Sequence, residues 1–269
     1  MNDLISFDDS FFIAGSSGMV GSSIYRKLKE SGYGLDKNGG KIFSPNRNEL
    51  NLSDNYQVNK WFEKNKPTVV IMTAAKVGGI FANQTQQGDF ILQNLKIQTN
   101  VIDSSWKNGV RRLLFLGSSC IYPKFAEQPI REEYLLNGLL EKSNEAYAIA
   151  KIAGLKLCES LRNQYGFDAI SLMPSNLYGP NDNYHPENSH VMASLIRKFY
   201  TAVKNSHNEV LCWGSGKPMR EFLHVDDLSS AALLVLEKWF PKSDNDKNEF
   251  LPYLNVGFGS DISIFDLAK

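Results

Sequence analysis

The fold is decided by the stretch Phe11-Phe12-Ile13-Ala14-Gly15-Ser16-Ser17-Gly18-Met19-Val20-Gly21. Its first four residues form an uninterrupted apolar run, which is typical of a parallel strand buried on both faces. Glycines follow at G-x-x-G-x-x-G spacing, and a helical pattern runs from Met19 to about Glu30. Glycines between a strand and a helix let the backbone approach a pyrophosphate, whose charge the helix N-terminus stabilises. A tight turn would explain an isolated glycine triplet equally well, but the flanking strand and helix favour a dinucleotide site.

Strand and helix patterns alternate from this stretch onward. Apolar runs predict strands at 41–43, 69–73, 112–117 and 169–173. Helical patterns predict helices at 55–64, 89–107 and 145–165. Such alternation predicts an α/β fold with a Rossmann-like, doubly wound parallel sheet. We expect residues 1–175 to form the dinucleotide-binding domain.

The alternation stops after Pro174. The later sequence predicts a loop at 176–186, a helix at 189–203, a short strand at 210–213, a helix from its N-cap Asp226 to about Trp239, a polar loop at 241–249 and the start of a helix at 264–269. We expect residues 176–269 to form a smaller substrate-binding lobe, interleaved with the main domain, over the carboxyl ends of the strands.

Composition excludes several classes of protein. The 29 Lys and Arg residues balance 29 Asp and Glu residues, so no net charge attracts nucleic acid or an anionic membrane. Apolar runs such as 113–116 are too short to span a bilayer, and residues 1–10 lack the pattern of a secretory leader. The three cysteines form no C-x-x-C pair, which predicts a cytoplasmic protein without disulfides or a metal site. We expect Cys158 and Cys212 to be packing residues.

Tyr147 and Lys151 lie four residues apart in a predicted helix, so their side chains share a face. A phenol with a pKa of about 10 gives up its proton more readily when an ammonium group stabilises the phenolate. Ser118, at the end of the predicted strand 112–117, can hydrogen-bond the same substrate oxygen. Y-x-x-x-K also occurs on ordinary surface helices, but the glycine loop and Ser118 favour a site where hydride is transferred to a carbonyl.

Cys120 stands two residues after Ser118. A thiolate there can remove a proton from the carbon next to a ketone, and its free pKa of about 8.5 needs only modest tuning. Epimerisation also needs a group that returns a proton on the opposite face, for which His190 is a candidate. The alternatives are a buried packing thiol for Cys120 and a helix-start cap for His190.

The segment after the second predicted strand lacks an acid that would bind a ribose hydroxyl. It reads Ser44-Pro45-Asn46-Arg47 instead. The guanidinium of Arg47 can pair with a 2′-phosphate, which favours NADPH over NADH. The alternative is an exposed loop arginine.

Taken together, these residues resemble the GDP-L-fucose synthases, a family of extended short-chain dehydrogenase/reductases. The resemblance is carried by Gly15–Gly21, Ala74–Ile80, Leu116–Pro123, Asn144–Leu157, Pro174–Pro180, Asn188–Val191 and Trp213–Asp227. Its most specific segments are S-S-C-I-Y-P and H-P-x-N-S-H. The resemblance implies NADP(H) as cofactor, a GDP-sugar as substrate, a homodimer, and the 3,5-epimerisation and 4-reduction of GDP-4-keto-6-deoxy-D-mannose to GDP-L-fucose.

The resemblance also implies a role for each matching residue. Tyr147 becomes the proton donor at the keto oxygen, Lys151 and Ser118 support it, and Cys120 and His190 become the epimerisation base and acid. The dinucleotide would be lined by Gly15, Ser16, Ser17, Gly18, Met19, Val20, Gly21, Arg47, Asn51, Leu52, Leu116, Gly117, Ser118, Ser119, Lys151, Pro174, Ser175, Asn176, Leu177 and His190. The GDP-sugar would be contacted by Lys198, Trp213 and Arg220, and the cation of Arg220 suits a diphosphate.

The sequence departs from the family pattern in three places. Ser17 and Lys198 stand where some members carry arginine, and the pattern continues beyond Lys269, so we expect an incomplete substrate lobe. Two alternatives stay open: another NAD(P)-dependent nucleotide-sugar epimerase or dehydratase, and a truncated, non-catalytic nucleotide-binding protein. Cys120 paired with His190 argues against the first, and the retained reactive residues argue against the second.

Overall fold

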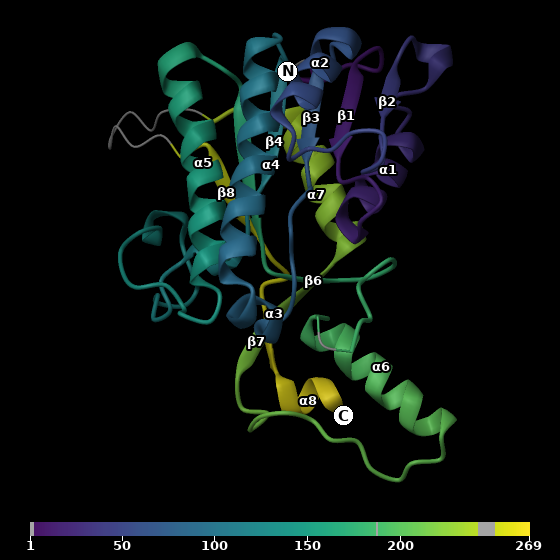
Figure 1. Cartoon of the computed structure of the whole chain (residues 1–269), viewed down its shortest axis with the longest axis vertical. Helices are drawn as coiled ribbons and strands as arrows, with labels where there is room; N and C mark the ends of the chain where they lie inside the picture. Colours follow the sequence, from purple (N-terminus) through teal and green to yellow (C-terminus); the bar gives the residue numbers. More distant parts are fainter. Residues whose placement is uncertain (1–2, 187, 242–250) are drawn as a thin grey trace.

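A six-stranded parallel sheet with helices on both faces forms the centre of the molecule (Figure 1). The computed structural model describes residues 3–186, 188–241 and 251–269. The strand order is β2-β1-β3-β4-β5-β8. This order differs from the order in the sequence, so crossover connections join strands such as β1 and β3, which are neighbours only in the sheet. The predicted Rossmann-like fold is confirmed.

The strands of this sheet are β1 (Ser10–Ala14), β2 (Lys41–Phe43), β3 (Val69–Met72), β4 (Arg112–Leu116), β5 (Ala169–Pro174) and β8 (Tyr253–Val256). Every residue of β3, β4 and β5 is buried, which explains their continuous apolar runs. Successive residues of one strand point to opposite faces. Phe12 therefore packs in the core beneath α4 and α5, while Phe11 and Ile13 pack in the core beneath α1 and α7.

The helices are α1 (Met19–Glu30), α2 (Asn55–Asn65), α3 (Ile80–Thr85), α4 (Gln87–Lys107), α5 (Glu145–Tyr165), α6 (Val191–Lys204), α7 (Val225–Lys238) and α8 (Ile264–Ala268). Two layers of helices cover the sheet, whereas α6 and α8 lie beyond the carboxyl ends of its strands (Figure 1). α4 packs between α2 and α5 on one face, and α1 packs against α7 on the other. No helix within the described ranges is long and apolar enough to cross a membrane.

A second, three-stranded sheet lies beyond the carboxyl ends of the first (Figure 1). It consists of β6 (Asn176–Tyr178), β7 (Met219–His224) and β9 (Asp261–Ser263) in the order β6-β7-β9. Although α7 and β8 come after residue 175, they lie with the main sheet: α7 packs on α1, and Ser175 N donates to Val256 O at 3.0 Å.

Four details of the sequence prediction are wrong. Residues 176–178 form a strand rather than a loop, because they pair with β7, forty-odd residues away. Residues 210–213 form no strand, since most of that segment is exposed and has no pairing partner. The N-cap of α7 is His224, whose Nδ1 accepts from Asp226 N at 3.2 Å, because the Asp226 carboxylate bonds Ser23 and Arg26. Cys212 is exposed rather than packed.

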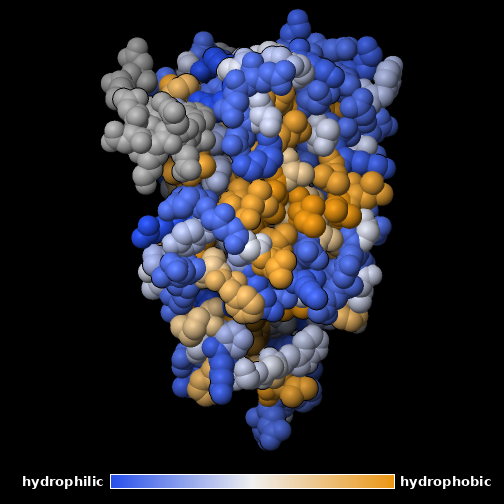
Figure 2. Space-filling view, turned by 90° about the vertical axis from the view of Figure 1, so that its left-hand side faces the viewer, coloured by the Kyte–Doolittle hydropathy of each residue, from blue (hydrophilic) through white to orange (hydrophobic). Residues whose placement is uncertain are grey.

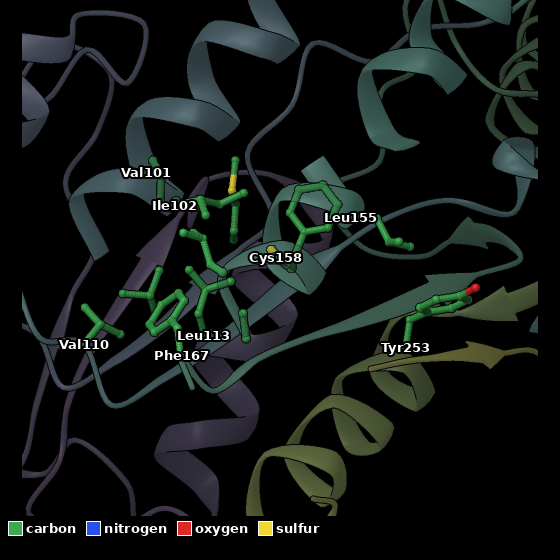
Figure 3. Close-up of a cluster of buried hydrophobic side chains, with 14 of the residues drawn as sticks. Val101, Ile102, Val110, Leu113, Leu155, Cys158, Phe167 and Tyr253 are labelled. Atoms are coloured by element: carbon green, nitrogen blue, oxygen red, sulfur yellow. The ribbon is translucent and has the colours of Figure 1, made fainter. Parts of the chain in front are cut away.

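Other details hold. Cys158 is buried in the core of Figure 3, as expected of a packing residue. A helix does begin at Ile264, and Ser263 caps it by accepting from Asp266 N. The polar loop predicted at 241–249 lies, except for Pro241, outside the described residues.

Candidate functional site

Most of the expected cofactor contacts follow the carboxyl ends of β1, β2, β4 and β5, on the side that faces the second sheet. In open parallel sheets this edge holds the loops between strands and helices, and ligands bind there. The glycine loop follows β1, the segment 117–122 follows β4, and Ser175 follows β5.

The glycine loop has the conformation of an anion-binding turn. Gly15 has φ +90°, a left-handed backbone that favours glycine, and Gly18 N donates to Gly15 O at 3.1 Å. Gly18 is the N-cap of α1, but no side chain caps the helix and no acidic residue lies in its first turn. The start of α1 therefore presents uncapped N–H groups and the positive end of the helix dipole, which fit a pyrophosphate.

Two hollows lie beside this loop, next to the end of β2. One, of about 280 Å³, is lined by Ser16, Ser17, Ser22, Tyr25, Arg26 and Ser44. The other, of about 390 Å³, is lined by Ile42, Phe43, Ser44, Pro45, Glu49 and Trp61. Arg47 lies exposed on the turn that follows β2. Sequence analysis overlooked Arg26, although it stands four residues after Ser22, on the same face of α1.

The remaining expected cofactor contacts are spread over several elements. Asn51 Oδ1 accepts from Ser53 N at 3.1 Å, and Leu52 O accepts from the buried Asn100. Leu116 and Gly117 are buried at the end of β4. Ser175 Oγ is buried and has no hydrogen-bond partner among the described residues. A buried hydroxyl of this kind calls for a partner, so the wall that it lines fits a polar cofactor.

The four residues expected at the carbonyl come together. Lys151, on α5, donates from Nζ to Leu116 O at 2.8 Å, and its Nζ lies 5.8 Å from the centre of the Tyr147 ring. Ser118 Oγ accepts from Cys120 N at 3.4 Å. Cys120 is close enough to both Tyr147 and Lys151 to affect their pKa values. Phe90, which sequence analysis overlooked, supports the Tyr147 ring edge-on at 6.4 Å between centroids.

Burial dominates the electrostatics of this group. It raises the pKa of Tyr147 above its ordinary value, and the neighbouring Cys120 raises it further. It also raises the pKa of Cys120 to about 11, although the Ser118 hydrogen bond and the Lys151 charge oppose the shift. Burial lowers the pKa of Lys151 to about 8. The sequence prediction of a thiol tuned toward neutrality therefore has the wrong direction in this structure.

His190 occupies the N-cap position of α6, but its side chain makes no capping hydrogen bond. Its imidazole is thus not committed to the structural role that the alternative interpretation gave it. His190 is exposed, yet desolvation by the surrounding protein atoms lowers its pKa, and the carboxylate of Asp182 opposes this shift. Asp182, whose pKa burial raises, was not recognised in the sequence.

The expected substrate contacts fall into two groups. Lys198 Nζ lies 4.4 Å from the centre of the Trp213 ring and donates to Leu211 O at 2.9 Å, which holds the segment 211–213 beside α6. Trp213 is 72 % exposed and so offers a flat ring for stacking. Arg220 lies exposed on β7 and donates to its neighbour Met219 O at 2.7 Å. Within the described part of the chain, no cluster of three His, Cys, Asp or Glu side chains could hold a metal ion.

The chain is similar to known proteins over nearly its whole length. Residues 11–248 match the NAD dependent epimerase/dehydratase family. The chain is 52 % identical to GDP-L-fucose synthase 1 of Arabidopsis thaliana, over 96 % of this chain and 75 % of the relative. It is 50 % identical to GDP-L-fucose synthase of Escherichia coli, over 96 % and 78 %. Its structure matches a GDP-D-glycero-L-gluco-heptose synthase of Campylobacter jejuni, solved in the presence of NADPH, with a TM-score of 0.85, 33 % identity and coverage of 98 % and 84 %.

Proposed function

The chain belongs to the NAD dependent epimerase/dehydratase family, and from this premise we propose that it converts GDP-4-keto-6-deoxy-D-mannose into GDP-L-fucose. The reaction combines epimerisation at C3 and C5 with NADPH-dependent reduction at C4. One observation carries the proposal: Cys120 lies within electrostatic reach of Tyr147 and Lys151, so one site holds groups for both kinds of chemistry. Two relatives that this chain resembles are GDP-L-fucose synthases. In each, the aligned part covers at least three quarters of the relative, and about half of the aligned residues are identical to this chain.

NADPH, when bound, supplies the hydride that C4 accepts. The start of α1 would hold its pyrophosphate, because the helix end is uncapped and its first turn contains no acidic residue. Arg47 would pair with the 2′-phosphate, and Arg26 lines the adjacent hollow. Ser175 Oγ would hydrogen-bond the cofactor from the end of β5.

In the reduction, Tyr147 donates its phenolic proton to the keto oxygen at C4. Its raised pKa keeps the phenol protonated before the transfer, so the proton is present when it is needed. The Lys151 ammonium stabilises the phenolate that remains, and Ser118 hydrogen-bonds the same substrate oxygen.

In the epimerisation, Cys120 removes the proton from the carbon next to the C4 ketone, and the electron pair moves onto the keto oxygen as an enolate. Ser118 and Tyr147 hydrogen-bond this oxygen, and Lys151 supplies the nearby positive charge. His190 then delivers a proton to the opposite face of the carbon; desolvation lowers its pKa, which eases the release of this proton, and Asp182 partly opposes that shift. Proton removal and return leave the sugar with inverted configuration and an unchanged formula.

The assignment of residues 1–175 to cofactor binding and 176–269 to substrate binding is part of the proposal. Lys198, Trp213 and Arg220, which we assign to the GDP-sugar, all lie in the later segment. Lys198 and Arg220 offer positive charge for the diphosphate, and the exposed Trp213 ring can stack on a flat base.

We also propose that the chain acts in the cytoplasm as a homodimer. The molecule exposes a broad band of apolar surface on one side (Figure 2). Exposed apolar side chains on the paired helices include Leu92 of α4 and Ile149 of α5, at 52 % and 42 %. Exposed apolar patches of this kind mark association surfaces. Light scattering at increasing protein concentration tests this, and a mass of one chain throughout would contradict it.

The experiment that tests the function uses the purified chain with NADPH and GDP-4-keto-6-deoxy-D-mannose. We expect NADPH absorbance to fall and NMR of the product to show GDP-L-fucose. Constant NADPH absorbance, with NADPH binding verified by calorimetry, would rule out the proposed function for this chain.

A further inference from the structure

A backbone contact joins the loop after β3 to the segment that precedes α6. Gly79 N donates to Asn188 O at 3.1 Å. A Cβ atom built on Gly79 would lie 2.6 Å from Ser189 O, a distance that real Cβ atoms essentially never show. The contact therefore requires glycine at position 79, and any larger residue must push the two segments apart.

The loop side of this contact is held firmly. Buried Asn94, on α4, binds both backbone groups of Lys76: Lys76 N donates to its Oδ1 at 2.8 Å, and its Nδ2 donates to Lys76 O at 3.0 Å. Buried Asn83 donates from Nδ2 to Gly78 O at 2.7 Å and to Gly79 O at 3.1 Å. With the loop fixed at both ends, strain at Gly79 is relieved by movement of the segment 188–189.

That segment leads directly into His190. Ser189 is its neighbour in the chain, and His190 begins α6 as the N-cap, its O accepting from Ser194 N at 2.9 Å. A displacement of Ser189 O thus displaces the imidazole. Tyr147, Lys151 and Cys120 are held separately, on α5 and the end of β4.

We infer that Gly79 is a positioning residue for His190: it sets the distance of the epimerisation acid from the sugar without affecting the groups that reduce the ketone. This inference rests on the proposed function. Since a misplacement of about 1 Å can cost roughly 100-fold in rate, relief of the 2.6 Å contact is large enough to matter.

The test compares Gly79→Ala with Gly88→Ala. Gly88, on α4, is a matched control, because a Cβ there would meet nothing within 4 Å. In deuterated water we expect Gly79→Ala to slow deuterium incorporation at C3 and C5 by roughly 10- to 100-fold, while ketone reduction changes by less than about threefold. The products should shift toward reduced sugar that has kept its original hydrogens at C3 and C5. Gly88→Ala should match the parent chain in both measurements.

A double variant shows whether the effect passes through His190. His190→Gln should reproduce the loss of exchange, and Gly79→Ala in that background should add nearly nothing. If Gly79→Ala does not fold, Asn83→Ala provides the second variant, because it releases the same loop while keeping the glycine. It should show a smaller loss of exchange with the same sparing of reduction.

Unchanged exchange in Gly79→Ala would overturn the inference, and so would equal losses of exchange and reduction. Full additivity with His190→Gln would also overturn it. A parent chain that incorporates no deuterium and oxidises no NADPH contradicts the proposed function instead, so the two failures can be told apart.

Discussion

Lys151 Nζ donates a hydrogen bond to the carbonyl oxygen of Leu116 at 2.8 Å. This bond joins the N-terminal half of α5 to the last residue of β4. Ser118 and Cys120 follow that strand end directly, and Tyr147 lies one turn before Lys151 on the same helix. A single buried hydrogen bond therefore fixes the strand end and the helix relative to each other.

Lys151 predicts how reduction depends on pH. Burial lowers its pKa to about 8, so the ammonium is present below that pH and is lost above it. We expect the rate of ketone reduction to fall as the pH rises through about 8, measured as NADPH oxidation in single turnovers. In Lys151→Arg, whose guanidinium stays charged, the falling limb should move to higher pH. A limb that stays in place in this variant would mean that another group titrates.

Cys120 predicts the opposite trend for proton exchange. Its pKa of about 11 means that the thiolate fraction rises with pH throughout the neutral range. Deuterium incorporation at C3 and C5 should accordingly rise by up to about tenfold per pH unit, even where reduction slows. NMR of the sugar in deuterated buffers measures this, and parallel pH profiles for exchange and reduction would contradict it.

Substitution of the same thiol separates the two reactions. Cys120→Ser should slow exchange by at least about 100-fold, because a hydroxyl ionises far less readily than a thiol and so supplies almost no anionic base. NADPH affinity should stay within about twofold, since no expected cofactor contact is removed. Cys212→Ser is the control, because Cys212 is exposed and far weaker effects are expected there. If Cys120→Ser exchanges normally, Cys120 is a packing residue.

The proposed role of Arg47 predicts how the chain chooses between cofactors. Loss of a charged hydrogen bond costs roughly 1.5–3 kcal/mol, so Arg47→Ala should weaken NADPH binding by about 10- to 100-fold. NADH, which has no 2′-phosphate, should bind as before. Titration calorimetry with both cofactors measures the difference, with exposed Arg131→Ala as the control. An unchanged NADPH affinity would mean that Arg47 does not bind the 2′-phosphate, and Arg26, which lines the neighbouring hollow, would be tested next.

Asp168 is the main determinant of stability that can be tested apart from function. Its carboxylate pairs with the fully buried Arg112 and with Arg162, and Arg112 also donates to Val235 O at 3.1 Å. Asp168→Ala leaves the Arg112 charge buried without this partner and should cost about 3–5 kcal/mol of unfolding free energy in urea titrations. Asp103→Ala, which removes the exposed pair with Lys107, should cost no more than about 1 kcal/mol. Equal costs would show that the Arg112 pair is not a buried one in solution.

The parts of the fold that the sequence predicted are those encoded locally. The strands β3, β4 and β5 are buried on both faces, so each appears as an apolar run. β6 and β9 are three residues long and partly exposed, and they exist only because each pairs with β7. No local pattern distinguishes such segments from loop.

The candidate site also has residues that the sequence reveals and properties that depend on the folded structure. Tyr147, Lys151 and Ser118 were found because their spacing and their place after a strand are visible in the sequence. The pKa direction of Cys120 was not, since it depends on how deeply the surrounding elements bury the thiol. The influence of Asp182 on His190 depends on how the loop before α6 folds, and the contact of Gly79 with Asn188 joins distant segments, so neither is visible in the sequence.

The chain passes between the two sheets at Ser175, at the junction of His224 and Val225, and after Val256. The first and third of these crossings leave neighbouring strands of the main sheet, and Ser175 N is bonded to Val256 O across them. Two of the three connections to the smaller sheet are therefore coupled to each other before they reach it. The position of the smaller sheet relative to the strand ends is set by a pair of bonded segments rather than by two independent linkers.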